Sequence, residues 1–71
     1  MKHSDKYKNI GRKIAQYRLA NKMSQEELAN KIGISYSYLT QIEAPNVAIR
    51  MSLEVLFDIA EALNVDIKDL L

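Results

Sequence analysis

Apolar and polar residues follow helical spacing along the chain, and the points where helices begin are marked most clearly. A Ser or Asp at such a point accepts a hydrogen bond from the free N–H groups of the first turn, and an apolar residue before it packs on another four positions into the helix. This arrangement occurs four times, and Glu27 completes a capping box with the first cap. It predicts helices that begin near residues 25, 36, 53 and 67. The caps, with their flanking apolar residues, are Ser24 (Met23 and Leu28), Ser35 (Ile34 and Leu39), Ser52 (Met51 and Leu56) and Asp66 (Val65 and Leu70).

An earlier helix is predicted from about residue 5 to residue 20, because Ile10, Ile14 and Tyr17 recur on one face of a 3.6-residue period. Asn21 ends this helix if it takes the left-handed conformation, which Asn tolerates. Strand-like alternation is absent, so we expect an all-α fold of five helices, the last a single turn. The other predicted helices are 25–32 before Gly33, 36 to about 44 before Pro45, and 53–63 before Asn64.

The length of 71 residues bounds the chain to one domain with a modest core. The chain has no cysteine, so no disulfide or thiolate metal site can staple it, and small domains without staples often depend on oligomerisation. No apolar run approaches the roughly 20 residues that span a bilayer, and the polar, lysine-rich residues 1–9 do not resemble a secretory signal. We expect a cytoplasmic protein with a tail or helix start at residues 1–7 and one domain at residues 8–71.

Charge is unevenly distributed, although the net charge is only +1. Residues 1–23 contain seven basic residues and one acidic residue, a balance of +6, whereas residues 24–71 contain three basic and eight acidic residues, a balance of −5. The asymmetry predicts one basic and one acidic side. A basic side suits a nucleic acid, and it equally suits a solvated first helix, so charge alone does not separate the two.

The segment from Gln25 to Ile42 is typical of two short helices joined by a tight turn. Ala29 has only a methyl group, so it lets the third helix approach the second. Gly33 can take the positive φ that ends the second helix without steric cost. The apolar residues of this segment that we expect in a core shared with the first and fourth helices are Leu28, Leu39 and Ile42.

The run SQEELANKIGISYSYLTQIE, from Ser24 to Glu43, resembles the helix-turn-helix of the Cro/phage-repressor class, also called the XRE family. The resemblance extends to apolar positions on both sides and covers about residues 8–71. It implies a five-helix, lambda-repressor-like DNA-binding domain, whose third helix enters the major groove while the second lies across the phosphate backbone. It also implies a sequence-specific transcriptional regulator, which we expect to be a repressor that binds a pseudo-palindromic operator as a homodimer.

The resemblance assigns the exposed side chains of the third helix to DNA. The positions that match base-reading residues are Tyr36, Ser37 and Gln41, and the expected phosphate contacts are Gln25, Ser35, Tyr38, Thr40 and Arg50. Phosphate contacts fix register without selecting sequence, so loss of Gln25 is expected to weaken all sites alike, whereas loss of Gln41 relaxes sequence choice. Alternatives stay open for Ser35, which can serve as a helix cap, and for Gln41, which can be plain helix surface. For Tyr38 we favour a packed ring whose hydroxyl reaches the surface.

Arg18 and Glu43 match family positions that form a salt bridge between the first and third helices. An Arg–carboxylate pair can be bidentate, which makes it directional. We interpret this pair as structural, because it fixes the orientation of the recognition helix.

The loop at residues 44–51 departs from the family pattern, because it lacks a glycine, is about two residues longer than usual and has Arg50 as its only charge. Its apolar residues Val47, Ile49 and Met51 either contact a second copy of the chain, which we favour, or pack on the core. Phe57 indicates a second apolar surface on the same predicted helix. The core face of that helix is already supplied by Leu53, Leu56, Ile59, Ala60 and Leu63. In the family, dimers commonly use the last two helices and the loop before them, and the candidates here are Ile49, Met51, Val55, Phe57, Val65, Ile67 and Leu71.

The sequence does not indicate an enzyme. The only histidine, His3, lies in the tail, and there is no phosphate-cradling Gly-rich loop or cluster of metal ligands. We expect double-stranded DNA and a second copy of the chain as partners, with no cofactor, metal, small-molecule ligand or membrane. The alternative function is a protein-interaction module on the same fold, antitoxin-like or a partner of another regulator, which the near-neutral charge and the apolar loop favour.

Overall fold

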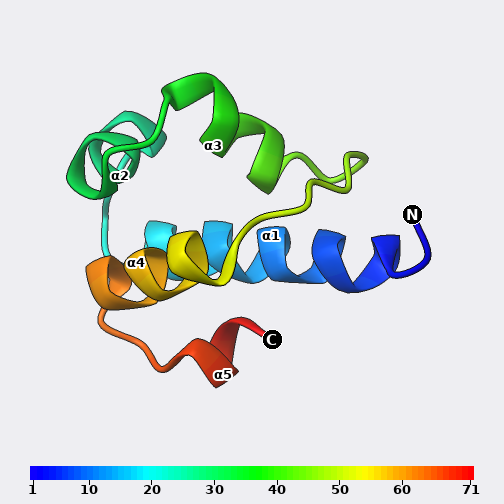
Figure 1. Ribbon diagram of the computed structural model, residues 1–71. Coiled ribbons are helices and arrows are strands. Elements are labelled where there is room, and N and C mark those ends of the chain that lie inside the picture. Colours follow the sequence, from blue (N-terminus) through cyan, green and yellow to red (C-terminus); the bar gives the residue numbers. More distant parts are fainter.

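The computed structural model describes all 71 residues and has five helices and no strands (Figure 1). Every helix begins within a residue of its predicted start, so the all-α, five-helix prediction is confirmed. The helices are α1 (Ser4–Ala20), α2 (Gln25–Ile32), α3 (Tyr36–Glu43), α4 (Leu53–Leu63) and α5 (Ile67–Leu70). None of them combines the length and the apolar character that crossing a membrane requires.

Side-chain caps set the starts of α2, α3 and α4 as predicted. The hydroxyls of Ser24, Ser35 and Ser52 each accept a hydrogen bond from the backbone N–H three residues later, at 3.0, 3.0 and 3.1 Å. At α2 the capping box is complete, because the Ser24 N–H donates to Glu27 Oε1 at 3.0 Å. At α5 the Asp66 N–H donates to the Asp69 carboxylate at 3.2 Å. These bonds satisfy N–H groups that a helix leaves free at its start.

The end of α1 is built differently from the prediction. Asn21 has a φ of −85° and is not left-handed, whereas the next residue, Lys22, has a φ of 56°. Asn21 acts through its side chain, whose amide nitrogen donates to the carbonyls of Tyr17 at 2.8 Å and Leu63 at 3.3 Å. A single side chain therefore ends α1 and ties it to the end of α4. The other predicted stops hold, since Gly33 and Asn64 have φ values of 77° and 58°.

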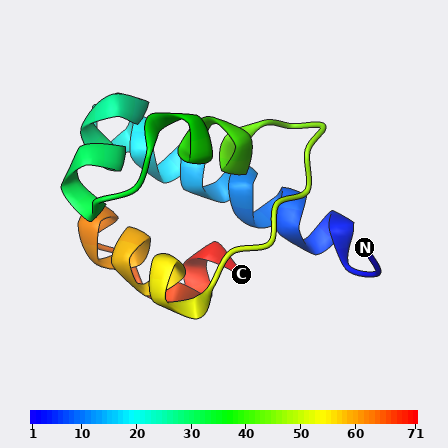
Figure 2. The ribbon, with the colours of Figure 1, turned by 45° about the horizontal axis from the view of Figure 1, so that its top comes forward.

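The apolar core lies where all five helices meet. In Figures 1 and 2, α1 runs through the middle of the domain, with α3 on one side and α5 on the other, and it packs against α3, α4 and α5. The helix pair α2 and α3 closes the remaining side, because α2 packs on both α3 and α4. The core consists of Ile10, Ile14, Leu28, Ala29, Leu39, Ile42, Leu56, Ile59, Ala60, Leu63 and Leu70.

At Gly11 the backbones of α1 and α3 lie close together. A Cβ atom at this position would overlap the carbonyl oxygen of Ile42, so no other residue fits without a shift of the backbone. The contact brings the middle of α1 against the last turn of α3. It therefore helps to set the distance between α3 and α1.

The α4 face and the loop before it differ in part from the predictions. Leu53 is 65% exposed, so the predicted core face of α4 begins at Leu56 and not at Leu53. Leu53 is the first residue of α4, where the helix has just left the loop and does not yet cover the core. Ile49 and Met51 are half-buried against the core, the second of the two expectations for this loop, while Val47 stays exposed.

Candidate nucleic-acid interface

A nearly buried ion pair joins the end of α1 to the end of α3. Arg18 Nε donates to Glu43 Oε2 at 2.9 Å, and Arg18 Nη2 donates to Glu43 Oε1 at 2.9 Å, which makes the pair bidentate. The two side chains are only 11% and 4% exposed. The expected salt bridge is therefore confirmed, and its geometry fixes the direction of both side chains.

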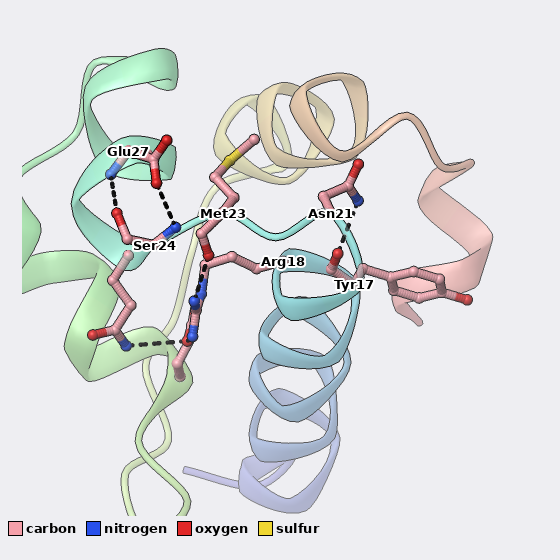
Figure 3. A network of polar contacts seen from close by, with 8 residues as sticks. Tyr17, Arg18, Asn21, Met23, Ser24 and Glu27 are labelled. Carbon is pink, nitrogen blue, oxygen red and sulfur yellow. Dashed lines mark hydrogen bonds and ion pairs between the residues drawn. The ribbon is translucent and has the colours of Figure 1, made fainter.

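Two further groups complete this network around Arg18. Its Nη1 donates to the carbonyl of Met23 at 2.8 Å, in the turn between α1 and α2 (Figure 3). Gln25, the first residue of α2, donates from Nε2 to Glu43 Oε1 at 3.1 Å. The Ser24–Glu27 capping box lies directly beside the network. The result is that α1, the turn after it, α2 and α3 are held together at one place.

The outer face of α3 is polar and open. Leu39 and Ile42 are buried on its inner face, while Ser37 and Gln41 are exposed on the other, and Tyr36 is 55% exposed. The three predicted base-reading side chains thus lie on the surface of the domain and not in its core. The helix that holds them, α3, begins after the Ser35 cap and ends at Glu43 of the ion pair. Both ends of the polar surface are therefore fixed.

The predicted phosphate-binding residues differ in their burial and in the hydrogen bonds that they already make. The Ser35 hydroxyl accepts the capping bond from the Tyr38 N–H and keeps its own proton for another acceptor. The Tyr38 ring packs half-buried against the core, as the favoured interpretation predicts, and the Thr40 hydroxyl donates to the Ser37 carbonyl at 2.7 Å. The latter bond uses the proton that Thr40 would offer to a phosphate. Arg50 is exposed in the loop before α4.

The carboxyl of Glu27, at the start of α2, has a lowered pKa. Its capping hydrogen bonds favour the ionised form of Glu27, since the Ser24 backbone N–H and, to a smaller extent, the Ser24 side chain lower the pKa of this carboxyl below its ordinary value of 4.5. The negative charge also suits the positive end of the helix dipole. The start of α2 is therefore stabilised by a carboxylate that is ionised at neutral pH.

Sequence reasoning missed two residues at this site. It assigned Gln25 to a phosphate alone, whereas its amide also bonds to Glu43 across two helices. It also passed over Gly11, although an isolated glycine in a helical pattern is a signal of close packing. No local signal reveals the Gln25 bond, because its partner lies 18 positions away.

The fold and this site together define a class of protein. Two short helices joined at a left-handed glycine, with a buried alanine in the first and a polar outer face on the second, form a helix-turn-helix domain. A family model described as helix-turn-helix matches residues 14–70. The chain belongs to this family, which is of the Cro/phage-repressor type that the sequence resembles.

Relatives of known identity support this assignment. The chain is 39% identical over 62 residues to the HTH-type transcriptional regulator SinR of Bacillus subtilis (strain 168), a match that covers 87% of this chain and 55% of SinR. The chain thus spans about half the length of the curated relatives that it matches.

Three solved structures have the same fold. A SinR protein/SinI protein complex matches with a TM-score of 0.80 and 39% identity, covering 87% of this chain and 59% of that chain. SinR in complex with DNA, described as the master regulator for biofilm formation, matches with a TM-score of 0.79 and 38% identity over 86% and 95% of the two chains. The restriction-modification controller protein C.AhdI of Aeromonas hydrophila matches with a TM-score of 0.83 and 29% identity over 97% and 100%.

Proposed function

We propose that this protein is a sequence-specific regulator of transcription that binds double-stranded DNA through α3. The observation that supports this most is the exposed polar face of α3, held at one end by a cap and at the other by a nearly buried ion pair. A helix that contacts base edges must protrude from the domain and keep a fixed direction, and this one does both. The structure of the relative SinR with DNA supports the same function.

Tyr36, Ser37 and Gln41 are the residues we assign to base edges in the major groove. A Gln side chain can contact adenine with two hydrogen bonds, while Ser and Tyr hydroxyls can donate or accept. Ser35, Gln25 and Arg50 are assigned to phosphates, because each has a hydrogen-bond donor and none of them is buried. Tyr38 can contact a phosphate only through its hydroxyl, because its ring packs on the core. Thr40 can donate to a phosphate only if its hydroxyl gives up the bond to the Ser37 carbonyl.

The proposed form on DNA is a homodimer that binds a pseudo-palindromic operator and represses transcription. Two-fold symmetry would place the two α3 helices about 34 Å apart, one turn of DNA. Phe57 and Leu71, two of the residues assigned to the dimer contact, are 53% and 62% exposed. The others pack half-buried on the core, and they are Ile49, Met51, Val55, Val65 and Ile67.

Selection of bound DNA from a random pool tests the proposed function directly. A shared, inverted motif among the selected sequences is the expected result, and recovery of no common motif would contradict sequence-specific binding. Affinity for the selected motif should fall steeply as salt rises, because bound phosphates release counterions. Gln41→Ala should relax the selected motif at one position, and Gln16→Ala, on the exposed surface of α1, is the matched control.

A second function, the binding of another protein, has its own support. Leu53 and Phe57 are exposed four residues apart on α4, and the relative SinR is known in a complex with SinI protein. Exposed apolar side chains are typical of protein contact sites. Salt dependence separates the two functions, because an apolar protein contact is far less sensitive to salt than contact with phosphates.

A further inference from the structure

Gln25 occupies an unusual place in the network around the ion pair. It is the first residue of α2, and its side-chain amide donates to the carboxylate of Glu43, the last residue of α3. The bond therefore joins the start of the first helix of the helix-turn-helix to the end of the second. The turn at Gly33 joins the same two helices at their opposite ends.

The Glu43 carboxylate has its position fixed from three directions. Oε2 accepts from Arg18 Nε at 2.9 Å, and Oε1 accepts from Arg18 Nη2 at 2.9 Å and from Gln25 Nε2 at 3.1 Å. Hydrogen bonds to a charged acceptor are among the stronger ones in proteins, and the carboxylate is only 4% exposed, so water competes little for it. Arg18 fixes α3 against α1, and the hydrogen bond from Gln25 ties the end of α3 to the start of α2.

An amide has more hydrogen-bonding capacity than this one bond uses. One N–H of Gln25 bonds to Glu43, which leaves a second N–H and the amide oxygen. Gln25 is half-buried, so part of the side chain still faces solvent at the start of α2. The same amide can thus hold Glu43 and contact a phosphate at the same time.

We propose that Gln25 is a positioning residue that couples the phosphate contact of α2 to the orientation of α3. The inference rests on the proposed function, and it revises the expectation for Gln25. A residue that only touches phosphate strengthens binding to every DNA sequence by the same factor. A residue that also orients the base-reading helix strengthens binding to the correct sequence more than to any other.

The test compares Gln25→Met, which keeps the length of the side chain but has no donor, with Gln25→Lys, whose ammonium group restores a donor to Glu43. Gln16→Met is the matched control, because Gln16 is exposed on α1, outside the network. Affinity is measured for the DNA motif selected in vitro and for an unrelated duplex of equal length. The ratio of the two affinities should fall about tenfold in Gln25→Met, the order of one hydrogen bond to a charged group. It should stay within about twofold of the original protein in Gln25→Lys and in Gln16→Met.

A second measurement needs no DNA. Amide hydrogen exchange in the last turn of α3, at Ile42 and Glu43, should become faster in Gln25→Met and remain unchanged in Gln16→Met. Equal weakening on both duplexes, or unchanged affinity on both, would overturn the coupling. Unchanged exchange would overturn the positioning role itself. Faster exchange in a protein that binds neither duplex would leave the positioning role standing and reject the proposed DNA-binding function.

Discussion

Glu43 is the residue on which three helices converge, and its environment makes it sensitive to substitution. A nearly buried ion pair need not add net stability, but removal of one partner leaves the other charge buried and unpaired, at a cost of about 3–5 kcal/mol. Glu43→Ala leaves the Arg18 guanidinium, 11% exposed, with the Met23 carbonyl as its only acceptor. Since small domains are often stable by only about 3–5 kcal/mol, we expect this variant to be largely unfolded at room temperature.

Thr40→Ala is the comparison on the same helix. It removes a hydroxyl that bonds to the Ser37 carbonyl, an exposed local contact, so the free energy of unfolding should change by less than about 1 kcal/mol. Circular dichroism without denaturant shows whether Glu43→Ala is folded, and urea denaturation gives the midpoint of every variant that is. Equal midpoints for Glu43→Ala and Thr40→Ala would contradict the structural role of the pair. Arg18→Met combined with Glu43→Leu should recover most of the loss, because neither charge is then buried alone.

Gly11 is sensitive for a steric reason. Its missing side chain makes room for the Ile42 carbonyl, so Gly11→Ala forces α1 and α3 apart. We expect a loss of about 1–3 kcal/mol from overpacking, although Ala is by itself the better helix former by about 1 kcal/mol. Gly33→Asn is the control, because nothing lies within 4 Å of a Cβ there and Asn tolerates the φ of 77°. A Gly11→Ala variant as stable as the original in urea would show that the helix contact is less tight than described.

At the scale of the helices, most of the fold could be predicted from the sequence. Helix starts depend on a cap and on the residues within one turn of it, and these lie next to each other in the chain, as at Ser24 and Glu27. Gly33 was predictable for the same reason, since the left-handed conformation at a helix end is a local property. The Arg18–Glu43 pair came only from the family pattern and not from local rules.

The features that sequence reasoning missed depend on contacts between distant residues. The Gln25 bond requires the end of α3 to lie at the start of α2, and the glycine contact requires α3 to cross α1 at Gly11. Asn21 was expected to act through its backbone, but its amide bonds to Leu63, a partner that only the packed fold provides. Leu53 was placed in the core by its spacing, and the position of the first turn of α4 leaves it outside.

The start of α2 should make stability depend on pH in a defined direction. Glu27 has a lower pKa in the folded protein than its ordinary value of 4.5, so its ionised form favours the folded state. This contribution is fully present above pH 4.5 and disappears as pH falls through the lowered value. Glu27→Gln keeps an acceptor oxygen for the Ser24 N–H but does not titrate.

Melting temperatures of the two proteins, followed between about pH 6 and the acid limit of folding, check this effect. The other carboxyl groups are the same in both, so the difference between the two curves isolates Glu27. The original protein should lose its advantage over Glu27→Gln below pH 4.5. Parallel curves over the whole range would mean that the capping carboxylate does not distinguish the folded from the unfolded chain.

For the domain as a unit, the exposed apolar side chains allow a test of the proposed dimer. Phe57 is 53% exposed on α4, and Leu19 is 64% exposed on α1, so the two are matched in exposure but lie on different helices. If the proposed dimer uses α4, Phe57→Gln should raise the dimer dissociation constant about 10- to 100-fold, the range that corresponds to burial of one large apolar side chain. Leu19→Gln should leave it unchanged. Sedimentation equilibrium measures both, and an equal effect of the two substitutions would exclude α4 as the specific contact.

The proposed dimer also predicts the spacing of the DNA half-sites. Two α3 helices related by two-fold symmetry meet the same face of the duplex only when the half-sites are about one turn apart, or 10–10.5 base pairs. An insertion of about half a turn between them rotates one half-site to the opposite face, so the dimer can then hold only one. Binding to the altered operator should drop to the level of a single half-site in the original protein. At protein concentrations where Phe57→Gln is monomeric, it should have the same affinity for both operators, whereas Leu19→Gln should distinguish them as the original protein does. If the original protein bound both spacings equally well, the distance between its two α3 helices would not be fixed. That result would contradict a rigid dimer formed through α4.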